Sequence, residues 1–568
     1  MSRNQNSRFS VNPTNIDIRR STFKRSSSVK LSFNTGDIIP FYVDEVLPGD
    51  TFKVKTSKVV RMQTLITPMM DNMYLDTYYF FVPNRLVWDH WQEFNGENTA
   101  SAWTQQIEYQ VPQVTAPDEI PPDGDDPGEP AGWRTGTIAD YMGIPVDVGG
   151  ISVNALPFRA YGLICSEWFR DENLMDPVYI DTGDTTVAGS NGNDYVTDIV
   201  LGGKPYKAAK YHDYFTSALP GPQKGPDVSL GMLSNAKVVG DGSALALSDG
   251  EYVNNLYTAS TTLRNSAKYG SDMGDAWNTG TATTVFGEKV LGIADKELLN
   301  TLGITSGLEV DFQGINVATI NELRFAFQLQ KLYEKDARGG TRYIEILKSH
   351  FGVTSPDARL QRPEYLGGNR KYINVNQVIQ QSETAGTPQG NVAAYSLTAD
   401  TNHDFTKSFV EHGFVIGLMV ARYDHTYQQG IERMWSRKSR FDYYWPVFAN
   451  IGEQAIKNKE IYAQGTSEDD EVFGYQEAWS EYRYKPSRVS GEMRSQYAQS
   501  LDVWHLADYY SELPKLSPEW IVEDKTNVDR VIAVSSRLAD QLFGDIYVEN
   551  ITTRPMPMYS IPGLIDHH

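Results

Sequence analysis

Residues 74–82 read Tyr-Leu-Asp-Thr-Tyr-Tyr-Phe-Phe-Val, and this stretch decides the fold class. Successive side chains of a β-strand point to opposite faces, so four consecutive aromatic residues at positions 78–81 would place rings on both faces. Pro83 then ends the strand. The pattern predicts a strand that is covered on both sides, and hence a chain with a β-rich core.

The sequence on either side of this stretch predicts a mainly β chain with long loop insertions and a few short helices. The apolar and charged residues of 51–55 alternate, as in a half-buried strand that follows the turn Pro48-Gly49-Asp50. Other predicted strands are 38–43, 414–423, 528–534 and 545–553. Predicted helices are 84–94, 319–335 (opened by the capping-box pattern Thr319 to Glu322) and 342–351, with Gly339-Gly340 and Gly352 as stops.

Two segments look like long connections. Residues 108–130 hold six prolines, seven acidic residues and no Lys or Arg, which predicts an extended surface loop. Asp123, Asp125 and Asp126 lack the EF-hand pattern, so a solvated loop is the better interpretation than a calcium site. Residues 181–305 are rich in Gly, Thr, Ser and Asn, and predict a loop-rich insertion with some strands of its own.

The charge is distributed unevenly along the chain. Residues 1–30 carry seven basic groups and one acid, a charge of +6, which leaves −27 for the remaining residues of a chain whose net charge is −21. A basic arm on an acidic body indicates a polyanion partner for the arm alone, although an ordinary solvated terminus has the same composition. The candidate nucleic-acid contacts are Arg3, Arg8, Arg19, Arg20, Lys24 and Arg25.

Several classes of protein are disfavoured. Cys165 is the only cysteine, so an intrachain disulfide is impossible, and no signal peptide or apolar run long enough to span a bilayer is visible. This predicts a protein of a reducing compartment without membrane insertion. The nine histidines are scattered, and His412 and His425, which bracket a predicted strand, would meet a metal only through tertiary structure. We predict no catalytic residue, cofactor or metal ligand; divalent cations at subunit boundaries stay open.

Several runs of sequence closely resemble the major capsid protein of microviruses, especially the gokushovirus branch. The most specific is Ala337-Arg338-Gly339-Gly340-Thr341-Arg342-Tyr343-Ile344-Glu345-Ile346-Leu347, which continues through Ser355-Pro356-Asp357 to Gly367-Gly368. Matching runs also begin at Pro40, Phe81 and Tyr484, in family order. The resemblance does not extend to 181–305.

The resemblance implies an eight-stranded antiparallel jelly roll and about sixty copies in a small T=1 icosahedral virion shell around circular single-stranded DNA. The implied divisions are an interior arm (1–30), the two parts of the jelly roll (31–180 and 306–568) and a threefold surface spike (181–305) that would recognise the host. The implied partners are further copies of the chain, the genome, a small basic DNA-binding protein, internal scaffolding and pilot proteins, and a host surface receptor. Assembly would occur in the bacterial cytoplasm.

Aromatic residues are candidates for contacts between subunits, because they bury large areas while keeping a polar atom. The candidates are Trp88, Trp91, Tyr443, Tyr444 and Trp445, and a position in the core of a single subunit is equally compatible with their sequence. Two other classes of protein stay open at this stage. A polysaccharide-active β protein would need only two suitably spaced carboxylates, and a phage adhesin would explain the long loops.

Overall fold

The computed structural model describes residues 19–97, 108–121, 128, 130–226, 237–240, 245–248, 253–256, 292–293, 308–311, 320–340, 342–353, 361–382, 389–390 and 392–559. Arg3, Arg8, Asp123, Asp125 and Asp126 lie outside these residues. The chain divides into two compact units, one made of Met1–Pro222 and Asp336–His568 and the other of Gln223–Lys335.

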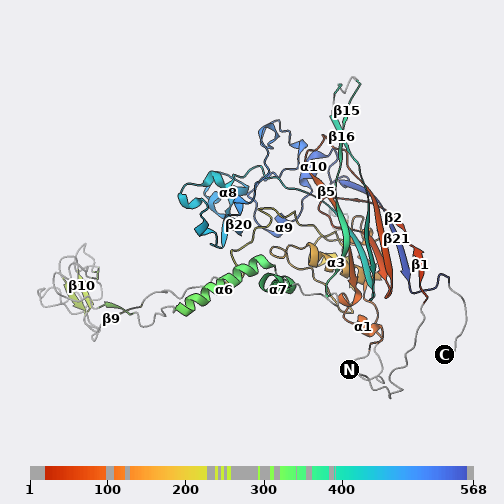
Figure 1. Ribbon diagram of the computed structural model, residues 1–568, viewed down its shortest axis with the longest axis horizontal. Coiled ribbons are helices and arrows are strands. Elements are labelled where there is room, and N and C mark those ends of the chain that lie inside the picture. Colours follow the sequence, from red (N-terminus) through yellow and green to blue (C-terminus); the bar gives the residue numbers. More distant parts are fainter. Residues whose placement is uncertain are drawn as a thin grey trace, which may run out of the picture. The chain divides into compact units, whose positions relative to one another are not determined.

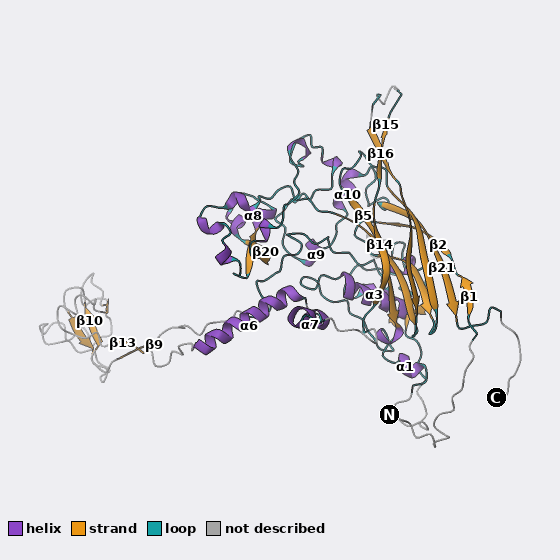
Figure 2. Ribbon diagram, viewed as in Figure 1, coloured by secondary structure: helices purple, strands orange, loops and turns teal. Residues whose placement is uncertain are grey.

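Two antiparallel sheets form the larger unit's framework (Figures 1 and 2). We call the first the terminal sheet, because it contains both ends of the described chain; its order is β1 (Ser21–Lys24) and β2 (Ser27–Phe33), β21 (Leu542–Arg554), β4 (Thr51–Met62) and β17 (Thr398–Ser408). The central sheet has the order β14 (Glu364–Tyr372), β5 (Met73–Pro83), β18 (Gly413–Tyr423) and β3 (Ile39–Val46).

The main core joins the two sheets. Val54 and Ile546 of the terminal sheet and Tyr79 and Val415 of the central sheet belong to one cluster of fully buried side chains. Alternation along β4 explains this, because every second residue from Phe52 to Met62 is buried while the residues between them are exposed or half-exposed. The chain is therefore mainly β, with sheets that pack as in a β-sandwich.

A second core covers the other face of the central sheet. Phe80 and Ile416 point into it, together with Trp133 and the helix α3 (Leu156–Ile164). Because β5 contributes Tyr79 to the first core and Phe80 to the second, the prediction of a strand covered on both faces is confirmed. β18 is buried along nearly its whole length for the same reason.

Smaller elements complete the larger unit. Its other strands are β6 (Gln113–Thr115), β7 (Ser152–Asn154), β8 (Val187–Ala188), β15 (Val375–Ile379), β16 (Val392–Ser396), β19 (Glu453–Lys457) and β20 (Val472–Glu477). Its other α-helices are α1 (Trp91–Phe94), α2 (Ile138–Tyr141), α7 (Tyr343–Phe351), α8 (Asn458–Ile461), α9 (Pro518–Ile521) and α10 (Thr526–Val531).

The described part of the smaller unit contains β9 (Lys237–Gly240) paired with β13 (Leu308–Asp311), and β10 (Leu245–Ser248) between β11 (Val253–Leu256) and β12 (Gly292–Ile293). The expected strands within the insertion are thus present. Most of α6 (Ile320–Gly339) also belongs here. The predicted helices 319–335 and 342–351 correspond to α6 and α7, and α7 ends at Gly352 in the left-handed conformation.

The predicted boundaries of two segments differ from the structure. Ser21–Lys24 and Ser27–Phe33 form strands against β21, so the segment that could be a free arm is shorter than 1–30. Residues 181–222 belong to the larger unit, where Ile199 and Tyr206 are buried in the second core. The separate compact unit begins at Gln223. The burial of residues such as Ile199 and Tyr206 could not be predicted from the sequence, because the apolar residues of this stretch are widely spaced among Gly, Thr and Asn.

Three predicted elements also need correction. Residues 528–534 are not a strand, because Val528, Val531 and Ile532 have helical spacing and bury one side of α10 and its end. The predicted helix 84–94 is broken into Asn84–Leu86 and α1. In the predicted loop 108–130, Val114 is fully buried because β6 pairs with β7 and β8.

The glycine pair Gly367-Gly368 lies within β14 and is not a turn. A Cβ at Gly368 would stand 2.0 Å from the carbonyl oxygen of Thr77, and one at Gly367 would stand 2.2 Å from that of Asp404. The backbones of β14, β5 and β17 approach too closely for side chains at these positions. By contrast, Gly340 follows the end of α6 with φ +90°, as a helix stop requires.

Candidate functional site

The four described residues of the basic candidate set lie at the terminal sheet. Arg19 is exposed. Arg20 donates a hydrogen bond to the carbonyl oxygen of Gly49, and its Nη2 lies 3.4 Å from Oγ1 of Thr51. Lys24 is exposed and its Nζ lies 3.6 Å from Oε1 of Glu549, so the pair is a weak surface contact.

Arg25 differs from the other three because its partner is a buried carboxylate. Its Nη1 and Nη2 donate to the two carboxylate oxygens of Asp44 at 2.8 and 2.6 Å, and only 8% of Asp44 is exposed. Tyr42 donates a hydrogen bond to the same carboxylate at 2.8 Å, and burial followed by the charge of Asp44 raises the pKa of Tyr42. A bidentate pair of this kind leaves the guanidinium little capacity for a phosphate.

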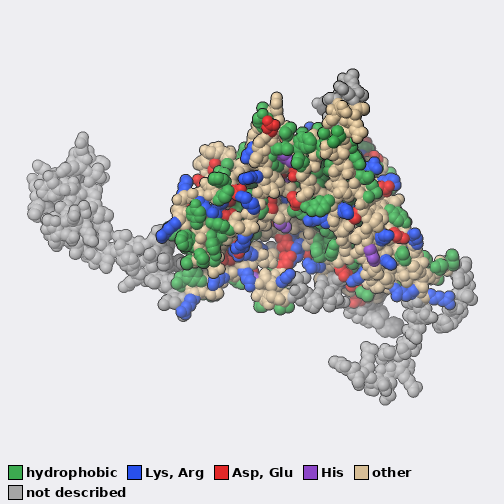
Figure 3. All heavy atoms as spheres, turned by 45° about the horizontal axis from the view of Figure 1, so that its top comes forward, with side chains coloured by type: hydrophobic (Ala, Val, Ile, Leu, Met, Phe, Trp, Pro, Cys, Tyr) green, Lys and Arg blue, Asp and Glu red, His purple; other side chains and the backbone are tan. Residues whose placement is uncertain are grey.

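An exposed run of apolar and aromatic side chains lies after β18; we call residues 434–451 the aromatic segment. Trp435 is 73% exposed and Val447 88% exposed. The other exposed apolar residues of the segment are Met434, Phe441, Tyr443, Tyr444, Trp445 and Ile451. On the face that Figure 3 shows, hydrophobic side chains gather in several patches with basic side chains among them. So large an apolar surface is characteristic of a protein–protein contact.

Short-range interactions hold the aromatic segment in place. The guanidinium of Arg437 lies over the ring of Tyr482 at 4.3 Å, and its Nη2 pairs with Glu481 at 3.0 Å. Trp445 Nε1 donates to the carbonyl oxygen of Arg440 at 2.9 Å. Trp479 Nε1 donates to the carbonyl oxygen of Phe448, also at 2.9 Å. A surface fixed before association loses less conformational freedom when it binds.

The five aromatic contact candidates separate into two groups. Trp88 is fully buried in the second core, where its Nε1 donates to Asp184 at 2.6 Å. The ring of Trp91 packs against that of Trp88 with centroids 6.1 Å apart. Tyr443, Tyr444 and Trp445 are each about half exposed, with exposed fractions of 52%, 45% and 50%. Trp88 is therefore unavailable for a contact between subunits, Trp91 is partly exposed, and the three residues of the second group are the most accessible. Sequence alone missed Trp435 and Val447, although they lie in the same run as the second group.

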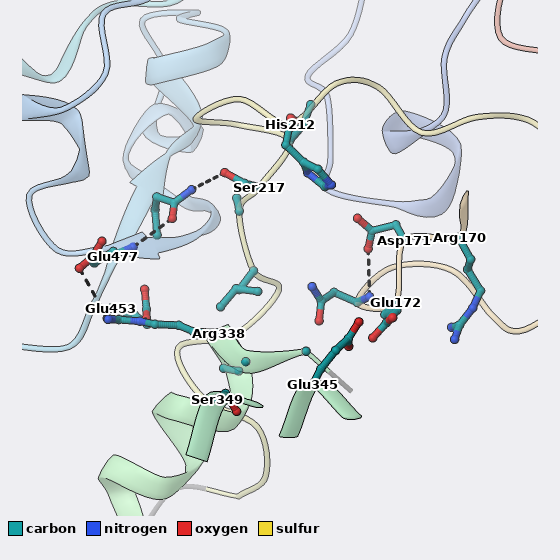
Figure 4. Close-up of a pocket in the computed structure, with 18 of the residues that line it drawn as sticks. Arg170, Asp171, Glu172, His212, Ser217, Arg338, Glu345, Ser349, Glu453 and Glu477 are labelled. Carbon is teal, nitrogen blue, oxygen red and sulfur yellow. Dashed lines mark hydrogen bonds and ion pairs between the residues drawn. The ribbon is translucent and has the colours of Figure 1, made fainter. Parts of the chain in front are cut away.

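The block at 338–345 borders a cavity of about 890 Å³ (Figure 4). Arg338 forms an ion pair with Glu453, whose side chain is 1% exposed, and lies 3.7 Å from Glu477. Arg342 pairs with Glu172, with Glu167 at 3.1 Å and with Glu345 at 3.2 Å. These two arginines pair with most of the carboxylates that line the cavity. The cavity is thus a place where ion pairs join distant segments.

His425 is buried between two carboxylates. Its Nδ1 lies 3.0 Å from Asp508 and its Nε2 3.1 Å from Glu523. Burial lowers the pKa of His425, but the two carboxylates outweigh burial and raise it to about 10. With a proton on each nitrogen, this imidazolium cannot ligate a metal. Throughout the residues that the structure describes, no group of three or more His, Cys, Asp or Glu is placed to hold a metal ion.

Nor does any described helix combine the length and the apolar character that crossing a bilayer requires. The described surface does carry groups that suit association. The fixed aromatic segment offers apolar area, and the exposed cations of the terminal sheet offer charge.

Comparisons with known proteins agree with this character. The family model described as "Capsid protein (F protein)" matches residues 11–564. The chain is 43% identical to capsid protein VP1 of Chlamydia phage 1, with 98% of this chain and 97% of that protein covered. It is 42% identical to capsid protein VP1 of Bdellovibrio phage phiMH2K, with 96% of each covered. Identity to capsid protein VP1 of Spiroplasma virus 4 is 44%, with 94% and 93% covered.

Because the family match covers nearly the whole chain, a capsid protein is a better interpretation than a polysaccharide-active protein or an adhesin. Among the described residues of the run that suggested the family from sequence, Arg338 and Arg342 form ion pairs, and Gly367 and Gly368 allow close backbone packing, which are structural roles. The chain belongs to the F-type phage capsid protein family, and it is a microvirus-type major capsid protein, a structural component of the virion rather than an enzyme.

Proposed function

We propose that about sixty copies of this chain close into a T=1 icosahedral shell around a circular single-stranded DNA genome. The observation that carries the proposal is the aromatic segment, an apolar surface that contacts within the subunit hold in place and that faces solvent. Each contact in a closed shell can be weak, since many contacts act together and the shell opens only when several are lost.

The strand order supports a jelly roll as the shell-forming fold. If β1 and β2 count as one interrupted strand, because both pair with β21, each sheet has four strands. The chain then passes between the terminal and central sheets in the order terminal, central, terminal, central, central, terminal, central, terminal. This alternation is the connectivity of an eight-stranded jelly roll. Its long insertions follow β5 and β18.

The smaller unit, Gln223–Lys335, is the proposed surface spike at the threefold axes and the region that recognises the host receptor. Its boundaries replace the 181–305 predicted from composition. Support comes from its separation as a compact unit and from its position between two strands of the framework. Exchanging 223–335 with the corresponding residues of a relative should change adsorption to host cells; unchanged adsorption contradicts the assignment.

The remaining partners follow from charge. Even if all of residues 1–30 were free, about sixty copies at +6 would supply at most roughly 360 positive charges, far fewer than the phosphates of a genome of a few thousand nucleotides. We therefore propose that a small basic DNA-binding protein and cations neutralise most of the genome, and that internal scaffolding and pilot proteins take part in assembly in the bacterial cytoplasm. Arg3, Arg8 and Arg19 are the arm residues we propose to contact DNA.

Electron microscopy and sedimentation of the purified chain test the shell directly. We expect uniform closed particles a few tens of nanometres across, formed by the chain alone or with its scaffolding proteins. If the material instead sediments only as monomers, small oligomers or open fibres in the presence of those proteins, the proposed shell is wrong.

A further inference from the structure

A buried amine reaches from one sheet of the framework to the other. Lys58 lies in β4, and its side chain is 2% exposed. Its Nζ donates hydrogen bonds to Oδ1 of Asn369 in β14, at 2.5 Å, and to Oγ1 of Thr77 in β5, at 2.9 Å. Because β4 belongs to the terminal sheet and β14 and β5 to the central sheet, the amine contacts an amide of the opposite sheet.

The surroundings of Lys58 favour an uncharged amine. Burial lowers the pKa of Lys58, and the charges of Asp400 and Asp404, which act to raise this pKa, do not outweigh burial. Among the described residues, the two groups within hydrogen-bond distance of Nζ are neutral, and the carboxylate of Asp400 lies further away at 3.6 Å. A neutral amine, unlike an ammonium group, has a lone pair and can act as a nucleophile.

The amide of Asn369 is held with its two ends on different partners. Thr77 Oγ1 donates to its Oδ1 at 2.7 Å, and its Nδ2 donates to Oδ2 of Asp400 in β17 at 2.6 Å. The carbonyl oxygen thus faces two donors, which withdraw electron density from Cγ and stabilise negative charge on the oxygen. The amino group faces a carboxylate that can pass a proton to it.

One carboxylate lies beside both nitrogens. Oδ2 of Asp400 is 2.6 Å from Nδ2 of Asn369 and 3.6 Å from Nζ of Lys58. Its position is fixed by the sheet, because Asp400 lies directly opposite Lys58 in the pairing of β17 with β4. A nucleophile, an electrophile and a proton carrier are therefore held together before any reaction, which removes the entropic cost of bringing them into contact.

We propose that Lys58 and Asn369 form an isopeptide bond within the folded subunit, with Asp400 as the proton carrier. Nζ attacks Cγ, a C–N bond forms, and the carbonyl electron pair moves onto Oδ1, to which Thr77 donates. Asp400 accepts one proton from Nζ and delivers it to Nδ2. The Cγ–Nδ2 bond then breaks and ammonia leaves. Asp400 ends as the carboxylate it began as, and the reaction needs no oxidant, reductant or further reactant.

The bond joins the two sheets covalently at strands that lie near their edges. β14 has a single neighbour, β5, in the central sheet, and β17 ends the terminal sheet beside β4. Lys58 and Asn369 are 311 positions apart, so the bond closes a long loop in the unfolded chain and thereby stabilises the folded state. All the reacting atoms belong to one subunit, and the bond is therefore independent of whether the subunits close into a shell.

The mass of the purified full-length chain tests the bond directly. Loss of ammonia should leave the parent about 17 Da below the mass of its sequence. Fragmentation of a proteolytic digest should identify two peptides joined through Lys58 and Asn369. A parent chain with the full mass of its sequence, or an ammonia loss that maps to other residues, overturns the proposal and leaves Lys58 and Asp400 as a buried ion pair.

Variants test the assigned roles. Lys58→Met removes the nucleophile and Asp400→Asn removes the proton carrier, so both chains should keep the full masses of their sequences. Lys371→Met is the matched control, because Lys371 Nζ also lies 3.6 Å from Asp400 but its side chain is 41% exposed. This control keeps all three reacting groups and should lose ammonia as the parent does. An Asp400→Asn chain that still forms the bond, or a control that does not, contradicts the role of Asp400.

A denaturing gel gives a second readout. Cys165 is the only cysteine, so no intrachain disulfide can hold the pieces of a cleaved chain together. After limited trypsin cleavage at a site between residues 58 and 369, the two pieces of the parent should migrate as one cross-linked species. The pieces of the Asp400→Asn chain should separate, while its circular dichroism spectrum remains that of the parent. Separation of the parent's pieces overturns the proposal.

Discussion

The imidazole of His425 and the carboxylate of Glu523 lie 3.1 Å apart, and both side chains are almost completely buried. Because Asp508 engages the other ring nitrogen, one buried cation joins the end of β18 to two separate loops of the larger unit. This relationship makes stability depend on pH.

The pKa of His425 is raised from 6.5 to about 10, so folding favours the protonated form. The stabilisation should be complete below about pH 6.5 and should disappear as the pH rises through 10. His425→Gln leaves two buried carboxylates uncompensated and should cost about 3–5 kcal/mol at pH 6. Thermal unfolding at pH 6, 8 and 10 checks this; a difference between parent and variant that stays constant over this range contradicts it.

Arg25 should behave as a structural residue. Arg25→Gln leaves Asp44 partly unpaired and should cost about 1–3 kcal/mol of unfolding free energy. Lys24→Gln, one residue away and exposed, should cost less than about 0.5 kcal/mol. Adding Asp44→Asn to Arg25→Gln should recover part of the loss. Urea unfolding measures all three, and equal stability of the Arg25→Gln variant and the parent would refute the assignment.

The aromatic segment should control assembly without controlling folding. Trp435→Ser removes a side chain that is 73% exposed, so the subunit should keep its thermal stability within about 0.5 kcal/mol. Particle formation, followed by light scattering and electron microscopy, should be lost. Trp435→Tyr keeps an aromatic surface and should restore particles. Normal assembly of the Trp435→Ser variant argues against this surface as a subunit contact.

Gly368 should tolerate no side chain. Gly368→Ala would place a Cβ 2.0 Å from a backbone oxygen of β5, so the sheet must move, at a cost of about 3 kcal/mol. Gly465→Ala is a useful comparison, because its φ is +77° but nothing lies within 4 Å of the added Cβ. It should cost only about 1 kcal/mol. Similar losses of thermal stability in the two variants would show that backbone contact is not the cause at Gly368.

The framework was predictable where local pattern and packing agree. The adjacent rings of Tyr79 and Phe80 predicted a strand covered on both faces, and the alternation in β4 predicted which of its side chains are exposed. The apolar run at Val528 and Val531 was wrongly predicted as a strand, because a short apolar run fits a strand or a helix equally well. Nothing local to Val114 distinguishes it from a residue of an open loop, since its burial depends on strands from distant positions.

The candidate sites were predictable only in part. The basic residues of the N-terminal segment are visible in the sequence. The sequence does not show that Arg25 has a buried ion-pair partner while Lys24 is exposed, because that partner, Asp44, comes from another strand. Trp88 and Trp445 are the same residue type in similar sequence, yet one is core and the other is surface. The cluster around His425 gave no signal at all, because its three members are brought together by tertiary structure alone.

The pairing of β21 with β4, β1 and β2 also bears on how the protein is made. β4 ends at Met62 and β21, which lies between β4 and the strands β1 and β2, begins at Leu542. A ribosome working at about 5–20 residues per second therefore needs roughly half a minute to a minute and a half to make the residues between them. A prematurely terminated chain never receives β21. We therefore expect that polypeptides lacking β21 cannot form the terminal sheet and are not incorporated into the virion.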